Sequence, residues 1–280
     1  EDTDDDGIPD KCQGSTGDGV HEVPSEYSTI QEAIMAAGHG DTVLVSPGVW
    51  TGNGDWVINP QSKSITIQST DGPEFTILDA ENKSRVVYCG AGEDASTVIQ
   101  GFTIANGYIS EECTGGGIIC TNNSSPKFID CIITDNFAKC YGGGIYCGNF
   151  GGEMDDKSSP TFNGCTIKNN TSSQGGGIYC SWNTNPTLLD CIINDNDAGY
   201  GAGIYCAEGS SPTLTDCEIN NNTAESTGGG MECWSSTPLL INCTFSSNSS
   251  NSLGGGIYLN GSSPQFTNCI ITQNTSSMGG

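Results

Sequence analysis

The sequence predicts an all-β solenoid, in which short parallel strands recur once per coil along one long axis. Three observations support this prediction. A glycine-led hexapeptide recurs from residue 115 onward, a second motif recurs inside each period, and short β-branched runs between turn residues precede them. A fixed period of about 20–50 residues indicates a repeat architecture whose units contact only their neighbours.

The hexapeptide reads GGGIIC in its first copy and GGGIYC, GAGIYC, GGGMEC or GGGIYL in later copies. Its first glycines are 27, 33, 26, 27, 26 and 25 residues apart, at Gly115, Gly142, Gly175, Gly201, Gly228, Gly254 and Gly279. The last copy is only begun. Side chains alternate along a strand, so the isoleucine and cysteine of each copy share one face and the residue between them takes the other.

The second motif has the form P-x-[FL]-x-x-C-x-[IF]-x-x-N and always spans the same number of positions. Its asparagines are Asn136, Asn170, Asn196, Asn222, Asn248 and Asn274. We expect this asparagine column to be structural. Asparagine tolerates the left-handed conformation of a tight corner, and stacked amides can bond from coil to coil.

One helix is predicted, over residues 29–37. Ser28 and Gln31 are expected to form its capping box, and Gly38 is expected to end it. Its apolar face consists of Ile30, Ala33, Ile34 and Ala37. Because the helix precedes the strands, we expect it to cover the N-terminal end of the solenoid.

The remaining strands follow as β-branched runs between Gly, Pro, Asn and Asp clusters. These runs are residues 42–45, 56–58, 64–67, 75–78, 86–89 and 98–104. The regular, cysteine-rich coils begin near residue 86, where Cys89 aligns with Cys120 and Phe102 takes the place of Cys131.

The stretch EVPSEYSTIQEAIMAAGHGDTVLVSPGVWTG resembles the opening of bacterial right-handed parallel β-helix proteins of the pectin-lyase-like class. The glycine-led repeats are similar to those of chlamydial polymorphic outer-membrane proteins, which are surface adhesins. The resemblance covers residues 23–280. It implies a right-handed parallel β-helix solenoid, with its capping helix, over residues 20–280. One departure is that the adhesins' Phe-x-x-Asn element is Phe/Leu-x-x-Cys here.

Residues 1–19 are expected to form an acidic calcium-binding loop and linker. Asp2, Asp4, Asp6 and Asp10 are spaced to converge on one hard cation, and Gly7 permits the turn between them. The pattern is similar to a thrombospondin type 3 calcium repeat. The cofactor prediction is therefore calcium.

Fifteen cysteines are typical of an exported protein rather than a cytosolic one. Twelve fall into two inward columns, Cys89/120/147/180/206/233 and Cys131/165/191/217/243/269. These columns pair as disulfides with an offset of one coil, or they stay as buried free thiols. Cys113 and Cys140, each two residues before a glycine motif on adjacent coils, are a separate disulfide candidate.

The outward residues of the hexapeptide include Tyr146, Tyr179, Tyr205 and Tyr258. This aromatic column can stack on sugar rings of cell-surface glycans, or it can simply cover the sheet. Outward carboxylates at Asp190 and Asp216 lie on neighbouring coils at a separation of roughly 5 Å, which a glycosidase could use. Solvated or calcium-bridged acids are the alternative.

The chain carries 33 acidic residues against 8 Lys plus Arg, a formal net charge of −25. This charge argues against nucleic acid and anionic membranes as partners, and the sequence has no apolar run long enough to span a bilayer. We expect a secreted, bacterial-type protein that is extracellular or on the cell surface.

The first functional hypothesis is a non-enzymatic structural or adhesive surface protein that self-associates end to end as a filament. The alternative is a polysaccharide lyase or glycoside hydrolase. The alternative lacks an obvious acid–base cluster, since the only arginine is Arg85 and both histidines, His21 and His39, precede the repeats.

Overall fold

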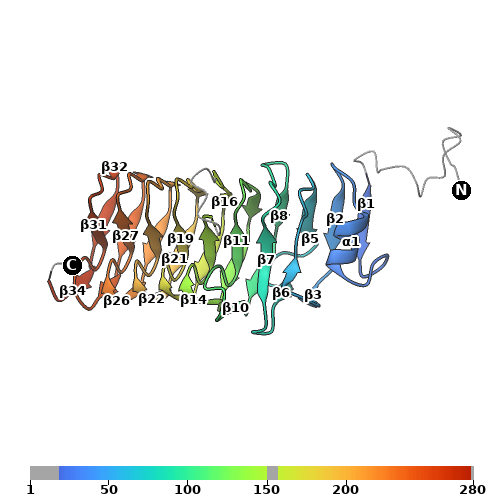
Figure 1. The fold of residues 1–280 in the computed structure, drawn as a ribbon, viewed down its shortest axis with the longest axis horizontal. Helices are drawn as coiled ribbons and strands as arrows, with labels where there is room; N and C mark the ends of the chain where they lie inside the picture. Colours follow the sequence, from blue (N-terminus) through green and yellow to red (C-terminus); the bar gives the residue numbers. More distant parts are fainter. Residues whose placement is uncertain (1–18, 150–156, 279–280) are drawn as a thin grey trace, which may run out of the picture.

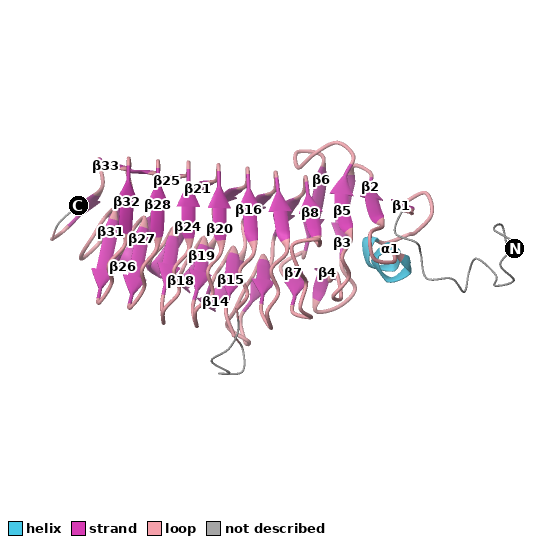
Figure 2. Cartoon of the chain, turned by 90° about the horizontal axis from the view of Figure 1, so that it is seen from above, coloured by secondary structure: helices cyan, strands magenta, loops and turns pink. Residues whose placement is uncertain are grey.

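In a computed structural model, which describes residues 19–149 and 157–278, the chain is a long rod of stacked coils (Figures 1 and 2). The strands of these residues form four parallel sheets that run along the rod, and the seven-stranded sheet begins only at β10. Each coil contributes up to one strand to every sheet. The all-β parallel solenoid that the repeats predict is therefore confirmed.

In the second motif, one strand follows the proline and another follows the cysteine. These strands belong to two sheets that meet at the corner between them. The ten-stranded sheet consists of β1 (Val20–Val23), β2 (Thr42–Val45), β5 (Thr66–Ser69), β8 (Val98–Gln100), β12 (Lys127–Ile129), β16 (Thr161–Asn163), β20 (Thr187–Leu189), β24 (Thr213–Thr215), β28 (Leu239–Ile241) and β32 (Gln265–Thr267). The nine-stranded sheet consists of β3 (Gly48–Thr51), β6 (Thr76–Asp79), β9 (Thr103–Ala105), β13 (Ile132–Thr134), β17 (Thr166–Lys168), β21 (Ile192–Asn194), β25 (Glu218–Asn220), β29 (Thr244–Ser246) and β33 (Ile270–Thr272).

The other two sheets lie on either side of the glycine triplet of the hexapeptide, and the eight-stranded sheet contains the three residues after that triplet. The seven-stranded sheet consists of β10 (Tyr108–Ile109), β14 (Phe137–Tyr141), β18 (Thr171–Gln174), β22 (Asp197–Tyr200), β26 (Thr223–Thr227), β30 (Ser249–Ser250) and β34 (Thr275–Ser276). The eight-stranded sheet consists of β4 (Trp56–Ile58), β7 (Arg85–Cys89), β11 (Ile118–Cys120), β15 (Ile145–Cys147), β19 (Ile178–Cys180), β23 (Ile204–Cys206), β27 (Met231–Trp234) and β31 (Ile257–Asn260).

Helix α1 (Ile30–Ala36) contacts β1, β2 and β4. Ile30, Ala33 and Ile34 are buried, as its apolar face predicts. The capping box is shifted by one residue from the prediction: Thr29 Oγ1 accepts from the Glu32 N–H, and the Glu32 carboxylate accepts from the Thr29 N–H, both at 3.2 Å. Thr29 has an extended backbone conformation and is the N-cap residue, directly before the first turn of the helix. Within the described residues, no helix has the length and apolarity to cross a membrane.

The glycine triplets allow neighbouring coils to approach closely. Gly115 adopts a left-handed φ of 59° at the corner. A Cβ on Gly117 would lie 2.6 Å from the carbonyl oxygen of Gly144 on the next coil, closer than real Cβ contacts. Larger residues at this corner would therefore force the coils apart.

The interior is a stack of apolar side chains and buried thiols. Phe128 and Phe162 stack with ring centroids 5.0 Å apart, and Cys89 pairs in register with Cys120 as predicted. All twelve column cysteines are free thiols, so the offset disulfide scheme is not found. The thiols have other partners: Cys165 Sγ, for example, donates to the main-chain oxygen of Phe128 at 3.5 Å.

The asparagine column is a buried hydrogen-bond ladder. Asn136 Nδ2 donates to Ile104 O and to Asn170 Oδ1, each at 3.0 Å, and Asn170 repeats the pattern with Asn196. The structural role is as expected, but the left-handed conformation is not on these asparagines. It falls on the residue before each, such as Asp135 at φ 57°. The asparagine side chain instead points inward, where it satisfies main-chain groups at the corner.

Candidate functional site

The floor of the candidate site is the outer face of the eight-stranded sheet. Tyr146, Tyr179 and Tyr205 are in register on β15, β19 and β23. Their rings stack at centroid distances of 5.6 and 5.4 Å and are nearly parallel. Burial raises the pKa of Tyr179 and Tyr205 well above the usual range, so both phenols are neutral at physiological pH.

These tyrosines are covered rather than open. Tyr146, Tyr179 and Tyr205 are only 4, 7 and 8% exposed, because each ring face lies against a neighbour. A sugar ring therefore cannot lie flat on them. Tyr258, one coil beyond Glu232, is half-buried and completes the outward column of tyrosines. The predicted tyrosine column supplies the floor of a site, and the rings accessible to a ligand lie on its sides.

Two walls rise beside this floor. One wall lies at the end of the seven-stranded sheet and in the preceding turns, at Glu112, Cys113, Thr114, Tyr141 and Gln174. The other wall is the row of turns that follow the eight-stranded sheet, at Asn149, Ser181, Trp182, Glu208, Trp234 and Ser235. Between the walls lie two adjoining hollows of about 270 and 400 Å³, which share Tyr141, Tyr179 and Glu208.

The hollows continue toward the N-terminal end of the rod. A hollow of about 490 Å³ over Tyr88 is lined by Arg85 and Glu112, and Glu112 also lines the first central hollow. The Tyr88 ring stacks on Trp56 at 5.1 Å, and Trp56 lines a further hollow of about 380 Å³ beside α1. Because neighbouring hollows share walls or stacked rings, we treat them as one groove, from α1 to Trp234, and call it the sheet groove.

Trp182 and Glu208 line the sheet groove, and both have an unusual, left-handed backbone conformation. Both occupy the same turn position, two residues after the cysteine of the hexapeptide, with left-handed φ values of 59° and 54°. The equivalent residue after Cys120 is Asn122, also left-handed at 55°. Asparagine tolerates this region well, whereas a bulky side chain there is an outlier that points to function. Sequence reasoning missed both residues, although a tryptophan at a position suited to asparagine was a readable signal.

Carboxyl groups with raised pKa values lie in the groove and beneath it. Burial raises the pKa of Glu208. Burial also raises the pKa of Glu232, although hydrogen bonds from Thr227 Oγ1 at 2.6 Å and Trp234 Nε1 at 2.5 Å oppose that shift. Glu232 thus interrupts the tyrosine column with a buried acid that fixes the Trp234 ring in place.

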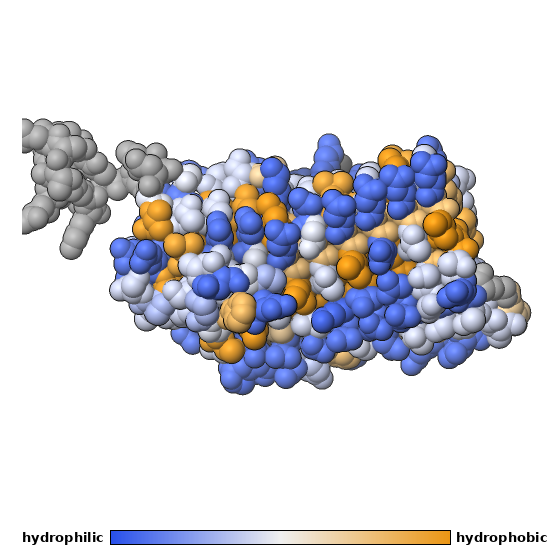
Figure 3. All heavy atoms as spheres, turned by 180° about the vertical axis from the view of Figure 1, so that it is seen from behind, coloured by the Kyte–Doolittle hydropathy of each residue, from blue (hydrophilic) through white to orange (hydrophobic). Residues whose placement is uncertain are grey.

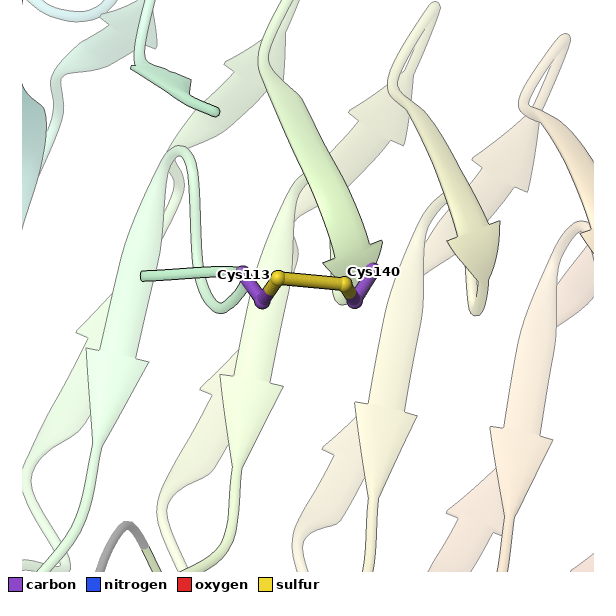
Figure 4. The surroundings of a disulfide bond; sticks show 2 residues. All are labelled: Cys113 and Cys140. Atoms are coloured by element: carbon purple, nitrogen blue, oxygen red, sulfur yellow. A yellow bond between two sulfur atoms is a disulfide. The ribbon is translucent and has the colours of Figure 1, made fainter. Parts of the chain in front are cut away.

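The wall formed by the preceding turns is held by two cross-links. Arg85 Nη2 lies 2.8 Å from Glu112 Oε2. Cys113 and Cys140 form a disulfide between adjacent coils, with Cα atoms 4.7 Å apart (Figure 4). Cys113 lines the first central hollow, and its φ of 71° is left-handed. The disulfide therefore fixes the wall of the groove.

The other predicted residues lie elsewhere. Asp190 and Asp216 are exposed at left-handed corners between the ten- and nine-stranded sheets, at φ 50° and 55°. Asp216 accepts a hydrogen bond from Asn242 at 2.9 Å. They act as corner residues outside the groove. Asp2, Asp4, Asp6 and Asp10 lie outside the described residues. Within residues 19–149 and 157–278, no group of three or more His, Cys, Asp or Glu side chains could hold a metal ion.

The opposite face of the rod looks different. Figure 3 shows hydrophilic residues in rows along the axis, with apolar residues between them. Ile192 and Ile270 are exposed on the nine-stranded sheet, but Glu218 and Thr244 separate them in the same register. The sheet groove, with its aligned aromatic rings and acids, is therefore the more developed site.

Comparisons with known proteins agree with the architecture. The structure is similar to the pectin methylesterase from carrot, with a TM-score of 0.50 and 15% identity over 95% of this chain and 91% of the other. It also aligns with the A-module of mannuronan C-5 epimerase AlgE4 from Azotobacter vinelandii, with a TM-score of 0.39 and 11% identity over 95% and 98% of the two chains. At 15% identity the likeness to the carrot pectin methylesterase speaks for the fold alone.

A comparison with curated protein sequences gives no significant match. A family model described as "Right handed beta helix region" matches residues 57–211 and 199–279, which together span most of the chain. Its two segments cover all the regular coils and most of the sheet groove. The chain belongs to this right-handed β-helix family.

Proposed function

We propose that the protein is a non-enzymatic extracellular adhesive protein, and that its sheet groove binds one extended polysaccharide chain without carboxylate or sulfate groups. The groove itself carries the proposal. It follows the rod axis over successive coils, so it suits a linear polymer better than a compact small molecule.

The aromatic residues of the walls support a sugar ligand. Trp234 is 41% exposed, and Trp182 and Tyr141 are half-buried beside it. Such rings offer a flat apolar surface together with a polar edge, which matches the two kinds of surface on a pyranose ring. The rigid sheet beneath them lowers the entropy lost on binding.

The charges of the groove support an uncharged ligand. The charged side chains that line the two central hollows are the carboxylates of Glu112 and Glu208. Arg85 pairs with Glu112, so repulsion of polyuronates and sulfated glycans comes from Glu208 and from the net charge of −25. Carboxylates also accept hydrogen bonds from sugar hydroxyls.

Calorimetry with size-defined neutral glucans, mannans and xylans tests the proposal, with polygalacturonate as the charged comparison. Trp182→Ala should weaken binding of a neutral ligand about tenfold, or about 1.4 kcal/mol. Phe75→Ala is the matched control, because Phe75 is 60% exposed and lies outside the groove. Equal affinity of Trp182→Ala and wild type, or preferential binding of polygalacturonate in the presence of a chelator, would contradict the proposal.

A polysaccharide hydrolase is the second candidate, and one observation favours it. Glu208 lines both central hollows, and burial raises its pKa. Carboxyl groups whose pKa is raised are suited to general acid catalysis. Release of reducing ends from a neutral polysaccharide, lost in Glu208→Gln and kept in Glu218→Gln, would establish hydrolysis and replace the adhesive proposal.

A further inference from the structure

The hollow beside α1 differs from the rest of the sheet groove because a helix forms one of its walls. Met35 and Glu32 of α1 face it from one side, and Trp50, Asp55 and Trp56 line the other. Its volume is about 380 Å³. Trp56 stacks on Tyr88, so the wall of this hollow adjoins the floor of the groove.

Helix α1 lies beyond the last strand at this end of the eight-stranded sheet. The sheet ends at β4, and α1 contacts β4 as well as β1 and β2. Glu32 and Met35 of the helix line the hollow at this end of the sheet, so the helix forms a wall across the end of the groove.

We propose that the hollow beside α1 is a terminal subsite, which receives the end residue of the polysaccharide chain. This inference rests on the proposed function, because it names how the same groove meets its ligand. A chain that lies along the tyrosine floor cannot pass through α1, so the last sugar must fit between the helix and the β3–β4 connection.

The lining of the hollow specifies the chemistry of that end residue. Trp50 and Trp56 provide ring surfaces, and Met35, which is 64% exposed, provides a flexible apolar contact. The charged side chains of the lining are Glu32 and Asp55, both acidic. Glu32 is already engaged as the helix cap, which leaves Asp55 to accept hydrogen bonds from sugar hydroxyls. An uncharged pyranose fits this set, and a uronic acid does not.

Binding at the end of the polysaccharide chain predicts a different stoichiometry from binding at any point along its length. Purified wild-type protein is titrated by calorimetry with linear neutral oligosaccharides and polysaccharides of increasing length, all from the class that binds in the panel above. The expected result is a fixed number of protein molecules per chain at every length. A number that rises in proportion to chain length, with binding retained, would overturn the terminal subsite but leave the proposed function in place.

Two variants on one helix locate the subsite. Met35→Trp fills the hollow and should weaken binding at least tenfold. Ala36→Trp, on an exposed neighbouring position that does not line the hollow, should bind like wild type. Circular dichroism controls for folding, and Met35 is exposed, so the helix tolerates the change. Equal affinity of Met35→Trp and wild type would overturn the inference. Absence of binding by wild type to every neutral polysaccharide would overturn both proposals.

Discussion

The turn position shared by Asn122, Trp182 and Glu208 is occupied by a different residue type in each of the three coils. The backbone there is left-handed in all three coils. Asparagine is comfortable in that region, whereas other side chains cost on the order of 1–3 kcal/mol. Trp182 and Glu208 therefore lower the stability of the fold relative to asparagine, and both line the sheet groove. A cost in stability together with a place in the groove is what we expect of a residue that binds ligand.

Trp182→Asn should separate the two effects. Removal of the indole should weaken binding of a neutral polysaccharide, and the better backbone fit should raise the free energy of unfolding by about 1 kcal/mol. Chemical denaturation and calorimetry on the same variant measure both quantities. A variant that loses stability while binding normally would show that Trp182 serves packing instead.

Glu232 predicts a dependence of stability on pH. Burial raises its pKa in the folded state above the ordinary value of 4.5, so the folded protein holds this proton more tightly than the unfolded chain does. The stabilisation is complete below the unfolded pKa and is lost as pH rises through the folded pKa. Glu232→Gln should therefore flatten the profile of melting temperature against pH on the acidic side, and Glu218→Gln, on an exposed strand position, should leave it unchanged. A wild-type profile identical to that of Glu232→Gln would contradict this account.

At the scale of elements, the turns before the glycine triplets are joined by the Cys113–Cys140 disulfide. It closes a loop with a sequence separation of 27, which stabilises a fold by about 3–4 kcal/mol through the unfolded state. Because Cys113 lines the groove, the same bond also positions Glu112 and Thr114. Stability and ligand affinity should then change together.

The double variant Cys113→Ser/Cys140→Ser should lower both the melting temperature and the affinity for the neutral polysaccharide. Cys269→Ser is a fair control, because Cys269 is a half-buried free thiol far along the rod. Differential scanning calorimetry and titration calorimetry measure the two effects. An unchanged affinity in the double variant would mean that the wall holds its shape without the disulfide.

At the scale of the whole molecule, the repeats made the fold predictable. The register of Cys89 with Cys120 and of Ile104 with Ile133 follows from spacing alone, because each coil stacks on the next. The capping box was misplaced by one residue, since Ser28–Gln31 and Thr29–Glu32 both match the sequence pattern. Only the extended backbone of Thr29 distinguishes them.

The groove was less predictable, because it depends on residues outside the repeated blocks. The column of Tyr146, Tyr179 and Tyr205 could be read from the hexapeptide, but the burial of its ring faces could not. That burial depends on ring stacking between coils and on walls from separate turns. Glu208 is not part of any motif, and it comes near Tyr141 and Trp234 only when four successive coils stack.

The acidic segment at residues 1–18 remains a calcium prediction from its spacing. Calorimetry should show calcium binding by the full chain, with Asp4→Asn/Asp6→Asn reducing the affinity at least tenfold, since each removes a charged oxygen ligand. Asp190→Asn/Asp216→Asn serves as the control, because these carboxylates lie at exposed corners. Calcium uptake that is the same in both double variants would exclude the acidic segment as the site.

The central claim is that a neutral polysaccharide lies in the sheet groove, and hydroxyl-radical footprinting with mass spectrometry tests it most directly. With a saturating neutral ligand, the account predicts that Trp182, Trp234 and Tyr141 become protected while Phe75, outside the groove, stays equally reactive. Protection of Phe75 with unchanged labelling of the three groove residues would contradict the account, because the ligand would then occupy another face of the rod.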